Sequence, residues 1–154
     1  VALRFANLFG PYGKAQAEFG FLNYFIGLAA AGKDITVFGD GSQIRNVLYV
    51  GDAVELLWRA AREDHLVGQA SFAVSEEHLD IATIARSIVE VFGRGRLVTV
   101  PWPPERKQIE VEHQWISGAK LYRLSHWRPQ HNLRQGLEAT WAVVQREGPS
   151  AVGL

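Results

Sequence analysis

One arginine inside an apolar strand pattern constrains this chain more than any other residue. Residues 43–50 alternate between two faces that are both mostly apolar, which is typical of a largely buried strand, and Arg45 lies on one of these faces. A guanidinium keeps its charge at physiological pH, and burying it without a partner is costly. Arg45 must therefore meet an anion or a stacked partner. For a lone arginine, an ion pair with a carboxylate of the same protein is the ordinary solution.

The residues before this strand have the composition of a turn. Gly39, Asp40 and Gly41 separate it from a second β-rich run at residues 35–38. Two β-rich runs with such a cluster between them predict a strand, a tight turn and a second strand paired as a hairpin.

Residues 39–52 read G-D-G-x-Q-x-R-N-x-x-Y-V-x-D, and this pattern resembles the signature of the extended short-chain dehydrogenases. These are the NAD-dependent nucleotide-sugar epimerases and dehydratases. The resemblance implies that Arg45 contacts the diphosphate of a sugar nucleotide. A planar guanidinium suits this role, because it can donate two parallel hydrogen bonds to phosphate, each worth roughly 1.5–3 kcal/mol. Asn46 departs from the pattern, since many members carry aspartate there.

A second match to the same family lies near the start of the chain. Residues 3–11 read L-R-x-x-N-x-F-G-P, which in the family follows the sixth strand of the dinucleotide-binding domain. The resemblance implies that the Asn7 carboxamide reaches the nucleotide-sugar phosphates and that the turn from Phe9 to Tyr12 lines the sugar side. The alternative for Asn7 is a side chain that caps its own turn.

Apolar spacing and turn residues predict the other elements. Strands are expected at residues 1–6, 68–74 and 96–100, and helices at 17–31, 52–63 and 81–92. Asp52 with Glu55 three places on predicts a capping box, and the apolar positions Val54, Leu57, Trp58 and Ala61 are expected to face inward. Glu76 and Glu77 are adjacent acids close to a helix start, where the dipole favours them, so a catalytic carboxylate pair is not expected.

The last third of the chain adds weaker matches. Arg106 and Lys107 follow a proline-rich connection, where members of the family hold the ribose or phosphate; a solvated loop is the alternative. Lys120, the run Trp127-Arg-Pro129 and the helix around residues 136–141 match the family's ending. The chain departs from that ending at Ser117, Ala119, Ser125 and His126, which weakens the expected contacts at the nucleotide end.

Composition limits the remaining classes of function. Sixteen basic and sixteen acidic residues cancel, and the basic ones are scattered, which argues against nucleic acid or a membrane as a partner. The chain has no cysteine, and His126 and His131 have no thiolate partners, so no metal site is expected. A cytoplasmic location is compatible with the lack of cysteine. The most apolar run, residues 21–31, is about half the ~20 residues that a membrane span needs.

Two features that the family needs are not in the sequence. There is no Gly-rich turn to hold the pyrophosphate of NAD, and none of Tyr12, Tyr24, Tyr49 and Tyr122 has a lysine four residues later. In the family both features lie in the half that precedes the equivalent of Val1. No catalytic residue is therefore expected here, and the chain alone is expected to be inactive.

The resemblance implies an α/β fold, namely the C-terminal substrate-binding part of an extended Rossmann-like dehydrogenase, with a small mixed sheet and several helices. Residues 1–154 are expected to form a single unit. The complete enzyme would use NAD on a nucleotide sugar, and a homodimer is possible. Two alternatives stay open: a non-catalytic binding module of the same fold, and an NAD(P)-dependent reductase that acts on a substrate without a nucleotide.

Overall fold

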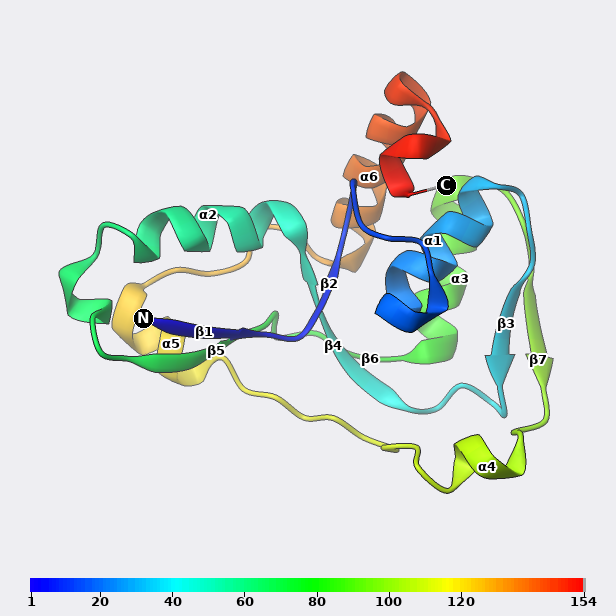
Figure 1. Ribbon diagram of the computed structural model, residues 1–154, viewed down its shortest axis with the longest axis horizontal. Coiled ribbons are helices and arrows are strands. Elements are labelled where there is room, and N and C mark those ends of the chain that lie inside the picture. The colour runs from blue at the N-terminus through cyan, green and yellow to red at the C-terminus, as the bar shows by residue number, and fades with distance from the viewer. Residues whose placement is uncertain (154) are drawn as a thin grey trace.

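The computed structural model describes residues 1–153, in which two groups of elements are joined by one long strand (Figure 1). In chain order the strands are β1 (Ala2–Phe5), β2 (Asn7–Phe9), β3 (Ile35–Phe38), β4 (Ile44–Tyr49), β5 (Ala70–Ala73), β6 (His78–Asp80) and β7 (Leu97–Val100). The α-helices are α1 (Phe21–Ala30), α2 (Val50–Ala60), α3 (Ile81–Phe92), α4 (Pro104–Lys107), α5 (Ala119–Ser125) and α6 (Leu133–Glu147). Short 3₁₀ turns lie at η1 (Ala17–Phe19), η2 (Asp64–Leu66) and η3 (Pro149–Val152).

The strands form three small sheets within the described residues. β1 pairs with β5, and β3 pairs with β7, both in parallel. β4 is the central strand of the third sheet, parallel to β2 and antiparallel to β6, so that this sheet is mixed. The α/β class and the small mixed sheet with several helices are thus confirmed.

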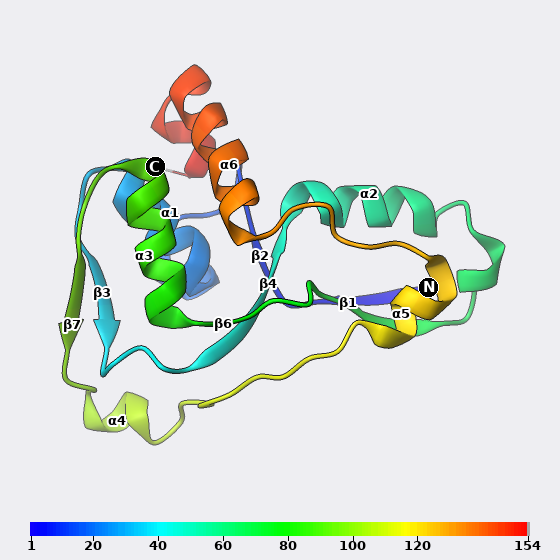
Figure 2. The ribbon, with the colours of Figure 1, turned by 180° about the vertical axis from the view of Figure 1, so that it is seen from behind.

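Two hydrophobic clusters flank β4. The larger is built on α1, α3 and α6, and Figure 2 shows α3 in front of α1 with α6 beside it. The smaller joins α2 and α5 to the β1–β5 pair, and its largest side chain is Trp127, which is 1% exposed. The residues from Arg45 to Leu48 of β4 are all buried, as the apolar pattern on both of its faces predicts.

The predicted hairpin is wrong, because β3 and β4 belong to different sheets. Gly39 and Gly41 do form the turn, with positive φ angles of 66° and 73°. The chain then bonds to the start of α3: the Ala82 N–H donates to the Gly41 carbonyl (3.0 Å) and the Ile81 N–H to the Gln43 carbonyl (3.1 Å). These contacts carry the chain from one sheet to the next instead of closing a two-stranded ribbon.

Helix α2 is present, but its predicted start and buried face are wrong. Its first residue is Val50 and its N-cap is Tyr49, because β4 runs directly into the helix. The expected inward residues Val54, Leu57 and Trp58 are 59%, 51% and 60% exposed, whereas Ala53 and Leu56 are buried. Glu55 accepts a hydrogen bond from the Trp127 indole N–H (2.8 Å) instead of completing a capping box.

The other helix predictions need little change. α3 covers residues 81–92 as expected, with Asp80 as a side-chain N-cap and Gly93 as a left-handed C-cap. The helix predicted at residues 17–31 is divided at Gly20, whose φ is 131°, into η1 and α1. The helix expected around residues 136–141 is α6, which a capping box of Asn132 and Gln135 opens.

Asn46 fixes three segments around β4. Its amide nitrogen donates to the carbonyls of Ser75 and Glu77 (both 3.3 Å), and its side-chain oxygen accepts from the Ile116 N–H (3.0 Å). The residue is completely buried. Aspartate, which the resembled family often has here, could not donate to the two carbonyls, so the departure fits the local packing of this chain.

The change Asn46→Asp is expected to lower the free energy of unfolding by roughly 2–4 kcal/mol, because it buries a carboxylate against two carbonyl oxygens. The control is Asn132→Asp at the N-cap of α6, where the side-chain oxygen accepts from the Gln135 N–H (2.9 Å) and aspartate caps equally well. Urea denaturation of both variants compares the same chemical change at a donor site and at an acceptor site. Equal losses would contradict this account of Asn46.

Gly136 allows α6 to approach β2 and β4. A Cβ at this position would lie 2.6 Å from the Phe9 ring and 3.0 Å from the Tyr49 ring. Gly136→Ala is therefore expected to destabilise the protein by about 1–2 kcal/mol, although alanine favours a helix by about 1 kcal/mol. Chemical denaturation measures whether the free energy of unfolding falls or rises. A rise would show that the rings of Phe9 and Tyr49 can move to admit the methyl group. Adding Phe9→Leu should remove most of the penalty of the alanine.

Candidate functional site

A cavity of about 560 Å³ lies between α1, β3, the start of β4 and the segment around α4. Arg45 reaches it from β4, Phe38 from β3 and Phe21 from the start of α1. The other lining residues are Ala17, Tyr24, Phe25, Thr36, Val37, Gln43, Ile81, Trp102, Arg106, Ile109 and Glu110. The cavity thus has a mostly apolar and aromatic wall with a few charged groups, which is the usual character of a small-molecule site.

Arg45 is the buried charge of this wall, with 8% of its surface exposed. Its Nη1 donates to the carbonyls of Ile44 (2.8 Å) and Glu112 (3.4 Å), and its Nη2 donates to the carboxylate of Glu110. The internal ion pair that the sequence leaves open is therefore present. It lies beside the cavity, and both partners line it.

Aromatic rings form the wall on the side of β3. The rings of Phe38 and Trp102 are tilted by 38° with centroids 5.3 Å apart, and the Arg106 guanidinium lies 5.4 Å from the Phe38 centroid. Trp102 also covers Gly39, where a Cβ would lie 2.5 Å from the indole nitrogen. The turn glycine is thus needed for the close approach of this ring, as well as for its positive φ angle.

The N-terminus of α1 adds a local positive field. Its first residue, Phe21, lines the cavity, and its N-cap is Gly20, which makes no side-chain cap. The first N–H groups of a helix have no partner within the helix, and the helix dipole favours an anion near them. Together with Arg45 and Arg106, this helix end makes the cavity suited to a ligand that carries negative charge.

The structure brings together two of the six predicted binding residues, because Arg45 and Arg106 both line the cavity. Asn7 is not among the lining residues: it lies on β2 opposite Val47 of β4 and donates from its side chain to the carbonyl of Asn46 (2.9 Å). Lys107 is exposed at the end of α4.

The remaining two lie away from the cavity lining. Phe9 is 1% exposed and packs in the larger hydrophobic cluster, so its ring presents no surface to a ligand. Tyr12 is 69% exposed, and its hydroxyl donates to Glu147 (2.7 Å), which raises the pKa of Tyr12. The expected lining of the sugar side by residues 9–12 is therefore not part of this cavity.

Sequence reasoning missed Phe38, Trp102 and Glu110 as lining residues. Phe38 ends a predicted strand next to the Gly-Asp-Gly turn, and Trp102 lies in the proline-rich connection after β7. Both positions are at strand ends, where side chains can turn toward a site, but their convergence depends on the pairing of β3 with β7. Glu110 lies 65 residues from Arg45, and no local pattern links the two.

A second cluster of titratable groups joins two helix starts. Asp52 in α2 is 3% exposed and accepts from the His131 backbone N–H (3.1 Å), and its carboxylate lies 3.0 Å from His131 Nδ1. The ring of Tyr49 lies 4.8 Å from the ring of His131, and burial, with the charge of Asp52 adding to it, raises the pKa of Tyr49. These contacts attach the segment before α6 to α2, which is a structural role for Asp52.

The starts of α2, α3 and α6 do not have the glycine-lined turn that holds a pyrophosphate in dinucleotide-binding domains. β4 enters α2 without a glycine-lined loop. The start of α3 is occupied by Asp80, which accepts from the Thr83 N–H (2.6 Å), and the Leu133 N–H at the start of α6 donates to Glu77 (2.7 Å). Carboxylates at these helix ends would repel a dinucleotide phosphate.

Within residues 1–153 no three His, Asp or Glu side chains are grouped so that they could hold a metal ion. No helix in this range combines the length and the apolar character that crossing a bilayer requires.

Comparison with known proteins agrees with the fold and with the motif at Arg45. The model of the NAD dependent epimerase/dehydratase family matches residues 1–74. UDP-N-acetyl-alpha-D-glucosaminuronate decarboxylase of Bacillus cytotoxicus is 30% identical over 142 residues, which are 90% of this chain and 44% of the relative.

Solved structures share the fold of this chain. UDP-glucose 4-epimerase of Thermotoga maritima, determined with UDP-glucose, has a TM-score of 0.80 at 22% identity over 94% of this chain and 45% of its own. UDP-glucuronic acid 4-epimerase of Bacillus cereus, determined with UDP-glucuronic acid and NAD, has a TM-score of 0.76 at 22% identity. The match covers 95% of this chain and 45% of the epimerase. The chain thus spans about 45% of the length of these proteins; it shares their fold, and its residues 1–74 are similar to the NAD dependent epimerase/dehydratase family.

Proposed function

We propose that this chain is the substrate-binding half of an NAD-dependent epimerase or dehydratase that acts on a nucleotide sugar, and that its cavity holds the nucleoside diphosphate. The observation that carries the proposal is Arg45, a buried guanidinium in the wall of a cavity large enough for a small ligand. Glu110 pairs with this guanidinium in the structure, and the open volume beside the pair has room for the anion of a ligand.

The diphosphate is assigned to the charged end of the cavity. Arg45 supplies a planar donor, the open start of α1 supplies a positive field, and Arg106 adds a third positive group. Guanidinium donors bind phosphate with charge-assisted hydrogen bonds that are about twice as strong as neutral ones. Asn7 acts from outside the cavity, because its bond to the Asn46 carbonyl fixes the strand that carries Arg45.

The nucleobase is assigned to the aromatic wall. Phe38 and Trp102 both line the cavity with their rings next to each other, and stacking of a base on an aromatic side chain is worth about 1–3 kcal/mol. The relatives above are named for UDP-sugars, which makes uracil the first base to test. Stacking by itself tolerates any base, so the aromatic wall is consistent with other nucleotides.

Chemistry at the sugar is not assigned to any residue described here. In the complete enzyme NAD would supply a hydride acceptor and donor, and the residues of this chain bind and orient the substrate. Two observations support assigning NAD binding to another part of the enzyme. This chain spans only about 45% of the length of its relatives, and carboxylates already accept hydrogen bonds at the starts of α3 and α6.

The test is calorimetric titration of the purified protein with UDP and with uridine. Arg45→Ala is expected to weaken UDP binding roughly 10- to 100-fold through the loss of charge-assisted hydrogen bonds to phosphate, and to leave uridine binding nearly unchanged. Arg96→Ala is the control, because Arg96 is exposed and its ion pair with Asp34 (2.9 Å) is outside the cavity. Unchanged UDP affinity in Arg45→Ala would contradict the proposal.

Titration with GDP-, CDP- and dTDP-sugars beside UDP-sugars then identifies the nucleotide. Hydride exchange with NAD in the presence of the bound sugar nucleotide would support an enzyme. Sugar-nucleotide binding by the full-length protein without hydride exchange would favour the non-catalytic module of the same fold, whereas this chain alone is expected to show no exchange.

A further inference from the structure

Arg45 already holds an anion, and that anion belongs to the protein. Two of its hydrogen bonds go to backbone carbonyls, those of Ile44 and Glu112, and the third goes to the carboxylate of Glu110. The carboxylate lies in the cavity wall at the place where the diphosphate is assigned. A phosphate that approached the outer nitrogen of Arg45 would meet a negative charge there.

The segment that carries Glu110 is weakly attached to the fold. After it, the chain is fixed to β4, because the Ile44 N–H donates to the Glu112 carbonyl (3.0 Å) and the Gln114 N–H to the Ile44 carbonyl (3.1 Å). Within residues 1–153, the N–H groups of Glu110 and Val111 have no backbone partner. Ile109 is 81% exposed and Val111 is 52% exposed, so little apolar burial holds this stretch in place.

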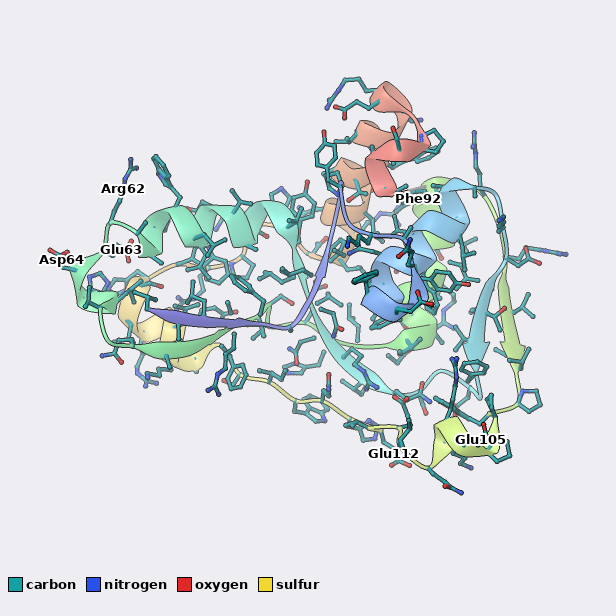
Figure 3. The ribbon with its side chains drawn as sticks, in the orientation of Figure 1. Arg62, Glu63, Asp64, Phe92, Glu105 and Glu112 are labelled. Atoms are coloured by element: carbon teal, nitrogen blue, oxygen red, sulfur yellow. The ribbon has the colours of Figure 1, made fainter. Side chains whose placement is uncertain are left out.

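Residues 109–111 therefore form a short, weakly attached arm that is fixed to β4 at Glu112. Figure 3 shows Glu105 on α4 and Glu112 on the connection that follows it, on either side of the arm that contains Glu110. The side chain of Glu110 is 26% exposed, against 10% for Arg45. Glu110 is the more exposed member and can regain water when it leaves, while a ligand phosphate in its place would keep the buried Arg45 paired.

We propose that Glu110 is an internal competitor that determines the specificity of this site: it occupies the position on Arg45 that a ligand phosphate takes, and binding exchanges the carboxylate for the phosphate. The inference rests on the proposed function. The exchange requires the ligand to bring more negative charge than it displaces, which favours a nucleoside diphosphate over a nucleoside or a singly charged anion. The side chain of Glu110 is partly exposed, so it can turn into solvent when it leaves Arg45. The Glu112 carbonyl, which is bonded to the Ile44 N–H, keeps its hydrogen bond to Arg45.

The alternative is a static pair that only neutralises Arg45 for folding. Such a pair predicts that removing the carboxylate lowers stability and leaves the cavity less ordered, so that a diphosphate binds no better than before. Competition predicts the opposite effect on affinity. The two accounts can therefore be separated by the direction of one measured change.

The decisive variant is Glu110→Gln, which keeps the size of the side chain and removes its charge. UDP is expected to bind about three- to tenfold tighter than to the wild type, an estimate reduced for the partial exposure of the pair, while uridine binds with unchanged affinity. Glu105→Gln is the matched control, because Glu105 is exposed on α4 and outside the cavity lining. Glu110→Asp, which withdraws the same charge by one methylene, should lie between the wild type and Glu110→Gln.

Calorimetric titration of the wild type and these variants, each confirmed as folded by circular dichroism, gives three informative outcomes. Tighter binding of UDP alone supports the competitor. Equal or weaker UDP binding by Glu110→Gln, with Arg45→Ala still defective, overturns the competitor and leaves the proposed function standing. Absence of UDP binding in every variant overturns both.

Discussion

The burial of one guanidinium is the constraint around which this structure is organised. Arg45 cannot lose its charge, and its strand runs between two hydrophobic clusters that exclude water from most of its length. The protein meets this requirement with two backbone carbonyls and one carboxylate, and it leaves an open volume beside them. A purely structural ion pair would not need that volume.

The rest of the fold keeps the strand of Arg45 in position. β4 has neighbours on both edges, and the side chain of Asn46 attaches it to the segments at residues 75–77 and 116. Helix α6 approaches closely over Gly136, and α2 continues the strand without a turn. A rigid strand is what a recognition residue needs, because a displaced donor loses much of its hydrogen-bond energy. The cavity wall also includes the segment of Glu110, whose N–H has no backbone partner among the described residues, so the wall combines a fixed strand with a weakly attached segment.

Local patterns predicted most elements and failed where contacts between distant segments decided the outcome. Helix α3 matches the range predicted from its apolar spacing, and the side-chain cap at Asp80 and the left-handed Gly93 found in the structure agree with it. The face of α2 was predicted wrongly: the periodicity of Val54, Leu57 and Trp58 indicates an amphipathic helix, but its packing on Trp127 buries Ala53 and Leu56 instead. The hairpin failed for a related reason, since two β-rich runs around a turn do not reveal that each pairs with a strand far along the chain.

The sequence by itself determined three things. Periodicity indicated the buried strand, the permanent charge of Arg45 showed that this residue needs a partner, and the motif with fixed spacing indicated the class of fold. Tertiary structure alone decided what surrounds that arginine. Glu110 contacts it and Trp102 lines the same cavity, both from a segment more than fifty residues away, whereas Phe9 and Tyr12 near the start of the chain turn to the core and to solvent. The physical reason is that a cavity is formed by the pairing of distant strands, and no local propensity encodes which side chains that pairing brings together.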